Sequence, residues 1–259
     1  MKTENQLHEK TRALQVVNII VASLLILTIF NFIPTWKLST KGMQKFEGSY
    51  INVYYEKEAV AAKDVFKLAD AEAAVIASKL GFTEKQDINI YIYDLQSTMQ
   101  AKKYGYIGPL LNLDWYIGDN IGTNVILTSP ANPGKVHTYS NNKYAALHEM
   151  VHAYISILNP KIKLWLTEGT ALYLTNGEKF NTSLLSNIPS YSDIQTQNPI
   201  KFSNMGGYDF ANTYIEYIDN TYGWDEVLDL IKTGDYEGVF GKSGEEIYSE
   251  WVNYLKSNQ

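Results

Sequence analysis

The chain contains no cysteine among its 259 residues. Disulfide bonds, thiolate metal ligands and cysteine nucleophiles are therefore excluded, and any metal site must use histidine and carboxylate ligands. Positive charge is also scarce, because 22 lysines and arginines stand against 28 acidic residues, for a formal net charge of −6. No cluster of basic and aromatic residues offsets this balance, so nucleic acid is not an expected partner.

The sequence does contain one long apolar run near its N-terminus. Residues 16–33 carry no charged side chain, and as a helix they would span about 27 Å, close to the thickness of the hydrocarbon core of a bilayer. Basic residues before the run favour a cytoplasmic N-terminus, although lysines also follow it. We therefore expect a single-pass anchor in the cell membrane, with the rest of the chain extracellular.

Two other interpretations of this run stay open. A signal peptide is disfavoured because the run is long for such a segment and Phe30 to Pro34 offer no small-residue cleavage pattern. A buried core helix is disfavoured because the run has no polar face. The anchor interpretation divides the chain into a cytoplasmic tail (1–15), a transmembrane anchor (16–33), a linker (34–48) and a folded domain (49–259).

Beyond the linker, the hydrophobic pattern changes along the chain from strands to helices. The first half is expected to contain, in order, strand 49–55, helix 58–80, strand 88–93, helix 94–104 and strand 124–128. The glycine-rich stretch 105–122 is expected to be irregular. The second half is expected to be helical, over residues 142–158, 165–175, 208–221, 224–232 and 244–256. Strands followed by helices favour an α+β domain.

One of these predicted helices carries the pattern His-Glu-x-x-His, from His148 to His152. Residues four apart on a helix share one face, roughly 6 Å apart along the axis, so both imidazoles can reach one metal ion. Glu149 lies beside the first histidine, where its carboxylate can activate a zinc-bound water by taking its proton. Two ordinary histidines are the other interpretation, but the apolar flanking residues would bury them without partners, which is unfavourable.

A third ligand is expected in the segment Trp165–Tyr173, which reads WLTEGTALY and contains Glu168. A catalytic zinc ion takes three protein ligands and leaves a fourth position open, and a carboxylate from a second helix completes a set of two histidines and one glutamate. The sequence therefore predicts one Zn²⁺ ion per chain, held by His148, His152 and Glu168.

Together, the HEMVH and WLTEGTALY motifs resemble those of the gluzincin zinc metallopeptidases, most closely the peptidase MA-like group. The resemblance covers about residues 49–256. It implies a zincin-like fold, with an N-terminal mixed sheet and helices and a C-terminal helical part, and hydrolysis of a peptide or protein substrate. It also implies that strand 124–128 forms a sheet edge lining the cleft, where a substrate could add as another strand.

The same resemblance implies that the hydroxyl of Tyr208 stabilises the oxyanion formed during hydrolysis, with Tyr214 as the next candidate. The chain departs from related enzymes at Leu172, where an acidic residue would orient a histidine ligand, so another partner must do this. His137 precedes the predicted zinc helix and is interpreted as an exposed loop residue, although it could contact substrate.

Two other functions stay open. One is a catalytically inactive, zinc-binding interaction module on the cell surface, which the presence of Glu149 disfavours because a structural metal site needs no general base. The other is a zinc hydrolase of a non-peptide amide or ester, which would use the same ligands. The sequence does not predict an oligomeric state.

Overall fold

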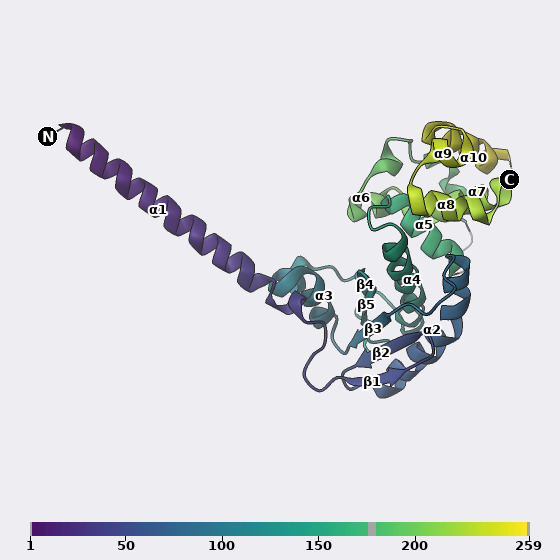
Figure 1. The fold of residues 1–259 in the computed structure, drawn as a ribbon, viewed down its shortest axis with the longest axis horizontal. Coiled ribbons are helices and arrows are strands. Elements are labelled where there is room, and N and C mark those ends of the chain that lie inside the picture. The colour runs from purple at the N-terminus through teal and green to yellow at the C-terminus, as the bar shows by residue number, and fades with distance from the viewer. Residues whose placement is uncertain (1, 176–179, 258–259) are drawn as a thin grey trace.

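The computed structural model describes residues 2–175 and 180–257, and one long helix projects from a folded body (Figure 1). This helix, α1 (Lys2–Asn31), includes both the predicted tail and nearly all of the predicted anchor. Its segment Arg12–Asn31 has a mean hydropathy of 2.4 and is 0% buried, so it is long and apolar enough to cross a membrane. The interpretation as a buried core helix is therefore wrong.

A five-stranded mixed sheet forms the N-terminal half of the body, in the order β1-β2-β3-β5-β4. Its three central strands are parallel to one another: β2 (Ile51–Tyr55), β3 (Ile88–Tyr93) and β5 (Asn124–Thr128). They correspond to the three predicted strands. The antiparallel edge strands are β1 (Gln44–Glu47) and β4 (Gly118–Ile121).

Neither edge strand was predicted. β1 lies within the expected linker, and β4 lies within the stretch 105–122 that was expected to be irregular. Both are four residues long and lack a clear apolar alternation, so their strand structure depends on pairing with a neighbour that local sequence does not reveal. Because β4 pairs with it, β5 is internal, and the prediction that strand 124–128 forms the sheet edge is wrong.

Two apolar cores lie on opposite faces of this sheet, because alternate side chains of a strand point to opposite faces. The larger core contains Ile90, Ile92 and Leu127, and helices α2 (Ala59–Lys79) and α4 (Tyr139–Leu158) pack on it. The smaller core contains Tyr93, Met99 and Ile126, and α3 (Gln96–Tyr104) covers that face. The sheet thus holds α3 and α4 on its two sides.

The C-terminal half is helical, as predicted, and its α-helices are α5 (Leu164–Leu174), α6 (Pro199–Asn204), α7 (Gly207–Tyr222), α8 (Trp224–Thr233), α9 (Tyr236–Phe240) and α10 (Gly244–Ser257). Helices α6 and α9 were not predicted. Short 3₁₀ helices are η1 (Ile33–Trp36), η2 (Gly105–Leu111), η3 (Thr182–Asn187) and η4 (Asp193–Gln195). The class is α+β, with a mixed sheet followed by helices.

Close packing of α5 against α7 fixes the position of the predicted third ligand. A Cβ atom at Gly169 would lie 2.4 Å from the carbonyl oxygen of Ala211, so only glycine permits this approach. The buried rings of Trp165 in α5, Tyr214 in α7 and Trp251 in α10 pack edge to face. The start of α5 is therefore held rigidly beside α4.

Candidate metal centre

Helix α4 carries the His-Glu-x-x-His motif between the sheet and the helical half (Figure 1). Thr138 caps its N-terminus: the Thr138 side chain accepts a hydrogen bond from the backbone N–H of Asn141, and the Asn141 side chain accepts one from the backbone N–H of Thr138. This reciprocal cap satisfies donors that the first turn would otherwise leave unpaired. The apolar face of α4, including Met150 and Ala153, is fully buried, which fixes the rotation of the helix and turns its histidines toward α5.

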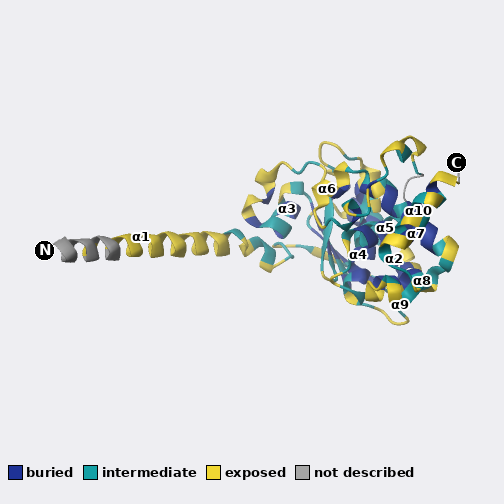
Figure 2. Ribbon diagram, turned by 90° about the horizontal axis from the view of Figure 1, so that it is seen from above, coloured by how far each residue is buried: buried dark blue, intermediate teal, exposed yellow. Residues whose placement is uncertain are grey.

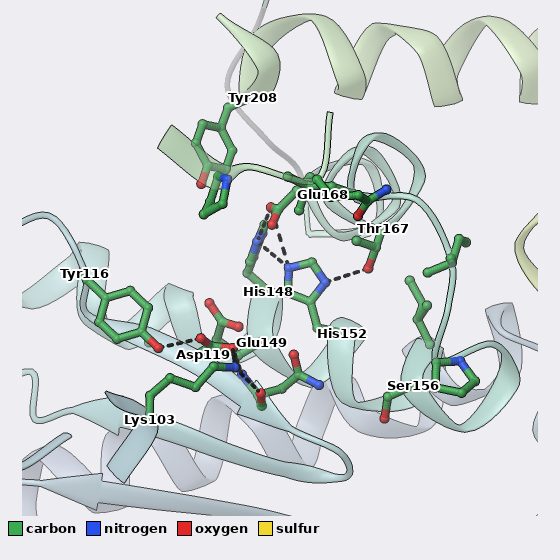
Figure 3. A pocket seen from close by; sticks show the side chains of 18 of the residues that line it. Lys103, Tyr116, Asp119, His148, Glu149, His152, Ser156, Thr167, Glu168 and Tyr208 are labelled. Carbon is green, nitrogen blue, oxygen red and sulfur yellow. Dashed lines mark hydrogen bonds and ion pairs between the residues drawn. The ribbon is translucent and has the colours of Figure 1, made fainter. Parts of the chain in front are cut away.

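Three predicted ligands converge between α4 and α5, and we call them the His–Glu trio: His148, His152 and Glu168 (Figure 3). The two Nε2 atoms lie 2.9 Å apart. Oε2 of Glu168 lies 3.1 Å from the Nε2 atom of His148 and 3.5 Å from that of His152. Ligand atoms around tetrahedral zinc, with bonds of about 2.0–2.1 Å, are separated by about 3.3 Å, so these separations fit one shared metal ion.

The hydrogen bonding of His152 also fits a metal ligand. Its Nδ1 atom lies 2.9 Å from the hydroxyl oxygen of Thr167, which can accept the Nδ1 proton and leave the Nε2 lone pair directed at the trio. Thr167 therefore supplies the orienting partner that Leu172 cannot provide. The sequence motifs did not predict this role for Thr167, although a hydroxyl directly before Glu168 was the available signal.

The trio brings acceptor atoms close together in a largely buried place, since its side chains are 9–19% exposed. Two acceptor atoms at this distance repel each other unless a proton or a cation lies between them. Burial raises the pKa of Glu168, but the neighbouring His152 and His148 outweigh this and hold it well below its usual range. A divalent cation at the centre of the trio would neutralise this carboxylate and remove the repulsion.

Glu149 lies beside the trio but faces the sheet rather than α5 (Figure 3). A Cβ atom at Gly118 of β4 would lie 3.1 Å from Cγ of Glu149, so the edge strand passes directly against this side chain. Burial raises the pKa of Glu149 to about 8, with nearby carboxylates raising it and the positive charges of His148 and Lys103 opposing the shift. Glu149 is thus a carboxyl group that can exchange protons near neutral pH.

Tyr208 lies at the start of α7 and lines the same pocket as the trio and Glu149 (Figure 3). Its side chain is 36% exposed. Burial raises its pKa, and the carboxylates of Glu168 and Glu149 raise it further, so its hydroxyl remains a hydrogen-bond donor. The alternative candidate, Tyr214, is wrong for this role because it is fully buried and its hydroxyl pairs with that of Tyr236.

Opposite the trio lies a second polar group, which we call the Lys103 cluster (Figure 3). It consists of Lys103 of α3, Asp119 of β4, and Tyr116, which precedes β4. Nζ of Lys103 lies 2.8 Å from Oδ1 of Asp119, and the hydroxyl of Tyr116 donates to the other carboxylate oxygen. Burial raises the pKa of Tyr116, and Asp119 adds to this effect. This cluster was not predicted from the sequence, because β4 was not predicted.

The trio, Glu149, Tyr208 and the Lys103 cluster all line one pocket of about 430 Å³. Its walls come from α3, β4 and the segment before it, α4, α5, and the starts of α6 and α7. His137 is not among the lining residues; it is partly exposed, and its Nε2 atom lies 2.9 Å from the carbonyl oxygen of Trp115. The arrangement can hold one cation beside a proton-accepting carboxyl group and a tyrosine hydroxyl, in a space open to solvent.

The sequence matches no protein-family model. It also matches no curated protein. Among solved structures, that of native yeast LTA4 hydrolase aligns with 83% of this chain and 38% of its own, at 13% sequence identity and a TM-score of 0.40. The chain thus spans about 38% of the length of that protein. A similarity at this level supports no conclusion about activity.

Proposed function

We propose that this chain is a zinc-dependent metallopeptidase of the gluzincin type. The observation that carries the proposal is the convergence of His148, His152 and Glu168 in one pocket with Glu149 beside them. The donor set, two imidazoles and one carboxylate, is typical of catalytic zinc, in which three protein ligands leave a position open for substrate or water. The zincin-like fold that the motifs imply is part of this proposal.

A zinc ion held by the trio would supply a Lewis acid that polarises a substrate carbonyl and acidifies water. Glu149 accepts the proton of the attacking water, and in its protonated form it can pass that proton to the leaving amine. The hydroxyl of Tyr208 donates a hydrogen bond to the carbonyl oxygen as negative charge develops on it. Thr167 holds His152 in the tautomer that binds metal.

We also propose that α1 anchors the enzyme in the cell membrane, with the catalytic domain extracellular. The apolar segment Arg12–Asn31 supports this arrangement because it is exposed and has the length of a bilayer span. The tail 1–15 is then cytoplasmic, with residues 2–15 extending the same helix, and residues 49–259 contain the catalytic domain. The substrate is a peptide or protein.

Two features distinguish this proposal from an inactive interaction module. A structural zinc site closes its fourth position, whereas the trio lines an open pocket. A structural site also has no use for a carboxyl group such as Glu149 beside the metal. The trio does not distinguish peptides from other amides or esters, so the substrate class must be tested directly.

The test uses the full-length chain in lipid nanodiscs, loaded with zinc and compared with Glu149→Gln. Both proteins should contain one zinc ion per chain, and the parent should cleave members of a peptide library, as detected by mass spectrometry. Glu149→Gln should cleave them about 10²–10⁴ times more slowly, because it cannot accept a proton. Zinc binding without cleavage of peptides, esters or other amides would favour the interaction module.

A further inference from the structure

An exposed apolar surface surrounds the point where α1 enters the folded body. It is formed by large apolar residues of η1, of η2 and of the turn between α1 and η1. We call these residues the junction face: Phe32, Ile33, Trp36, Tyr106, Ile107 and Leu110. Leu110 is 76% exposed and Trp36 is 68% exposed. No charged residue occurs in segments 30–36 or 105–113. Water is an unfavourable environment for such a surface.

The junction face is rigidly joined to the end of α1. The side-chain amide of Asn31 donates to the carbonyl oxygen of Tyr104, 3.1 Å away, and accepts from the backbone N–H of Ile107 at 3.0 Å. The rings of Phe30 and Tyr106 stack with centroids 5.4 Å apart. A Cβ atom at Gly105 would lie 2.3 Å from the carbonyl oxygen of Asn31, so glycine is required for this contact.

The position of the face along the helix matches the boundary of a bilayer. The spanning segment Arg12–Asn31 has 20 residues, and at 1.5 Å per residue it crosses about 30 Å, which is the thickness of the hydrocarbon core. The hydrocarbon would therefore end near Asn31, at the level of the junction face. Trp36 and Tyr106 have the amphipathic rings that are enriched at this boundary. The Asn31 amide, whose hydrogen bonds are made within the protein, does not depend on water there.

From these observations we infer that the junction face lies in the interfacial layer of the same bilayer that α1 spans. This inference rests on the proposed membrane anchor, and the partner is the headgroup and upper acyl region of lipid. Continuity with the spanning helix selects lipid over a protein partner, because the two apolar surfaces join without an intervening charged residue.

Membrane contact at this face would also fix where the metal pocket lies. The same helix α3 that leads into η2 contributes Lys103 and Tyr104 to the pocket wall. Figures 1 and 2 show α3 at the end of the body nearest to α1. The enzyme would therefore be held in one orientation, with the α3 side of its pocket toward the lipid surface.

The absence of cysteine allows a direct test with single spin labels. The full-length chain is labelled through Leu110→Cys in the junction face, Leu24→Cys in α1, or Val75→Cys in α2, and each protein is placed in phospholipid nanodiscs. Val75 is the matched control, an exposed apolar residue (58%) on a helix far from α1. Electron paramagnetic resonance then compares label collisions with oxygen, which concentrates in lipid, and with a water-soluble nickel chelate.

We expect the ratio of oxygen to nickel collisions to be severalfold higher at residues 24 and 110 than at residue 75. A lipid-like value at residue 24 with a value at residue 110 equal to that at residue 75 would overturn the inference and leave the anchor in place. Aqueous values at both residues 24 and 110 would overturn the anchor and the inference together. Because the measurement needs no catalysis, it is independent of whether the proposed peptidase activity is found.

Discussion

The His–Glu trio and the Lys103 cluster lie on two sides of one pocket, and they differ in how their charges are balanced (Figure 3). The carboxylate of Asp119 is paired with the ammonium group of Lys103, whose Nζ atom lies 2.8 Å away. Glu168 has two imidazoles, which are cationic only when protonated. The Lys103 cluster is therefore complete without a ligand, whereas the trio gains a permanent positive charge only by binding one.

The difference in charge balance provides a criterion for distinguishing a candidate metal site from a structural ion pair. Both groups are partly buried and both contain a carboxylate, so neither burial nor the presence of a carboxylate distinguishes them. The distinguishing feature is that the trio presents three acceptor atoms to one point, while the Lys103 cluster pairs each acceptor with a donor. Substitutions on the two sides should accordingly have different effects.

The largest effect is expected from Glu168→Ala. Removing the carboxylate leaves two neutral ligands, so zinc content measured by atomic absorption should fall from one per chain to nearly zero, and peptide cleavage should be lost. A saturating zinc concentration, 100 times the dissociation constant, should stabilise the parent by about 2.7 kcal/mol and the variant by little. Glu72→Ala, an exposed glutamate on α2, is the control. Full zinc content in Glu168→Ala would contradict the trio as the metal site.

The next largest effect is expected from Tyr208→Phe. Loss of a hydroxyl that donates to the developing oxyanion should reduce kcat by about 10²–10³-fold, with zinc content unchanged. Tyr104→Phe removes a hydroxyl from the other wall of the same pocket and should leave kcat nearly unchanged. Equal rates in the parent and Tyr208→Phe would show that the oxyanion is stabilised by another group.

A smaller effect is expected from Thr167→Val, which removes the partner of His152 Nδ1 and keeps the side-chain shape. Zinc affinity should fall about 10–100-fold, measured by competition with a chelator, because the imidazole loses its orienting hydrogen bond. Thr170→Val is the matched control, since that hydroxyl donates to the carbonyl oxygen of Leu166 within α5. If both variants lose the same affinity, the role assigned to Thr167 is wrong.

The smallest effect is expected from Lys103→Met. It leaves Asp119 without its cation, but these side chains are 33% and 21% exposed, so solvent screening limits the loss of stability to about 1 kcal/mol. Urea unfolding should show that loss, and the double variant Lys103→Met/Asp119→Asn should recover part of it. Zinc content should not change in either protein, and a reduced zinc content would mean that the two sides of the pocket are coupled.

Much of the fold was predictable, and the failures have a common cause. The strands 88–93 and 124–128 and the helices that became α4, α5 and α7 were found because buried faces impose a regular apolar spacing on the sequence. β1 and β4 were missed because an edge strand is paired on one side only and carries a weaker pattern. For the same reason Asp119 was not predicted to line the pocket, because it does so as part of β4.

The sequence by itself determined the ligand pair on α4, since residues four apart on a helix must share a face. It also determined the apolar segment of α1, because that property depends on composition alone. Tertiary structure decided everything that requires two distant segments to meet. The packing of α5 against α7 brings Glu168 to the histidines, and the start of α7 sets Tyr208 over the same pocket. Thr167 became identifiable as the partner of His152 only when α4 and α5 were seen together, because a hydrogen bond between two helices has no period in the sequence.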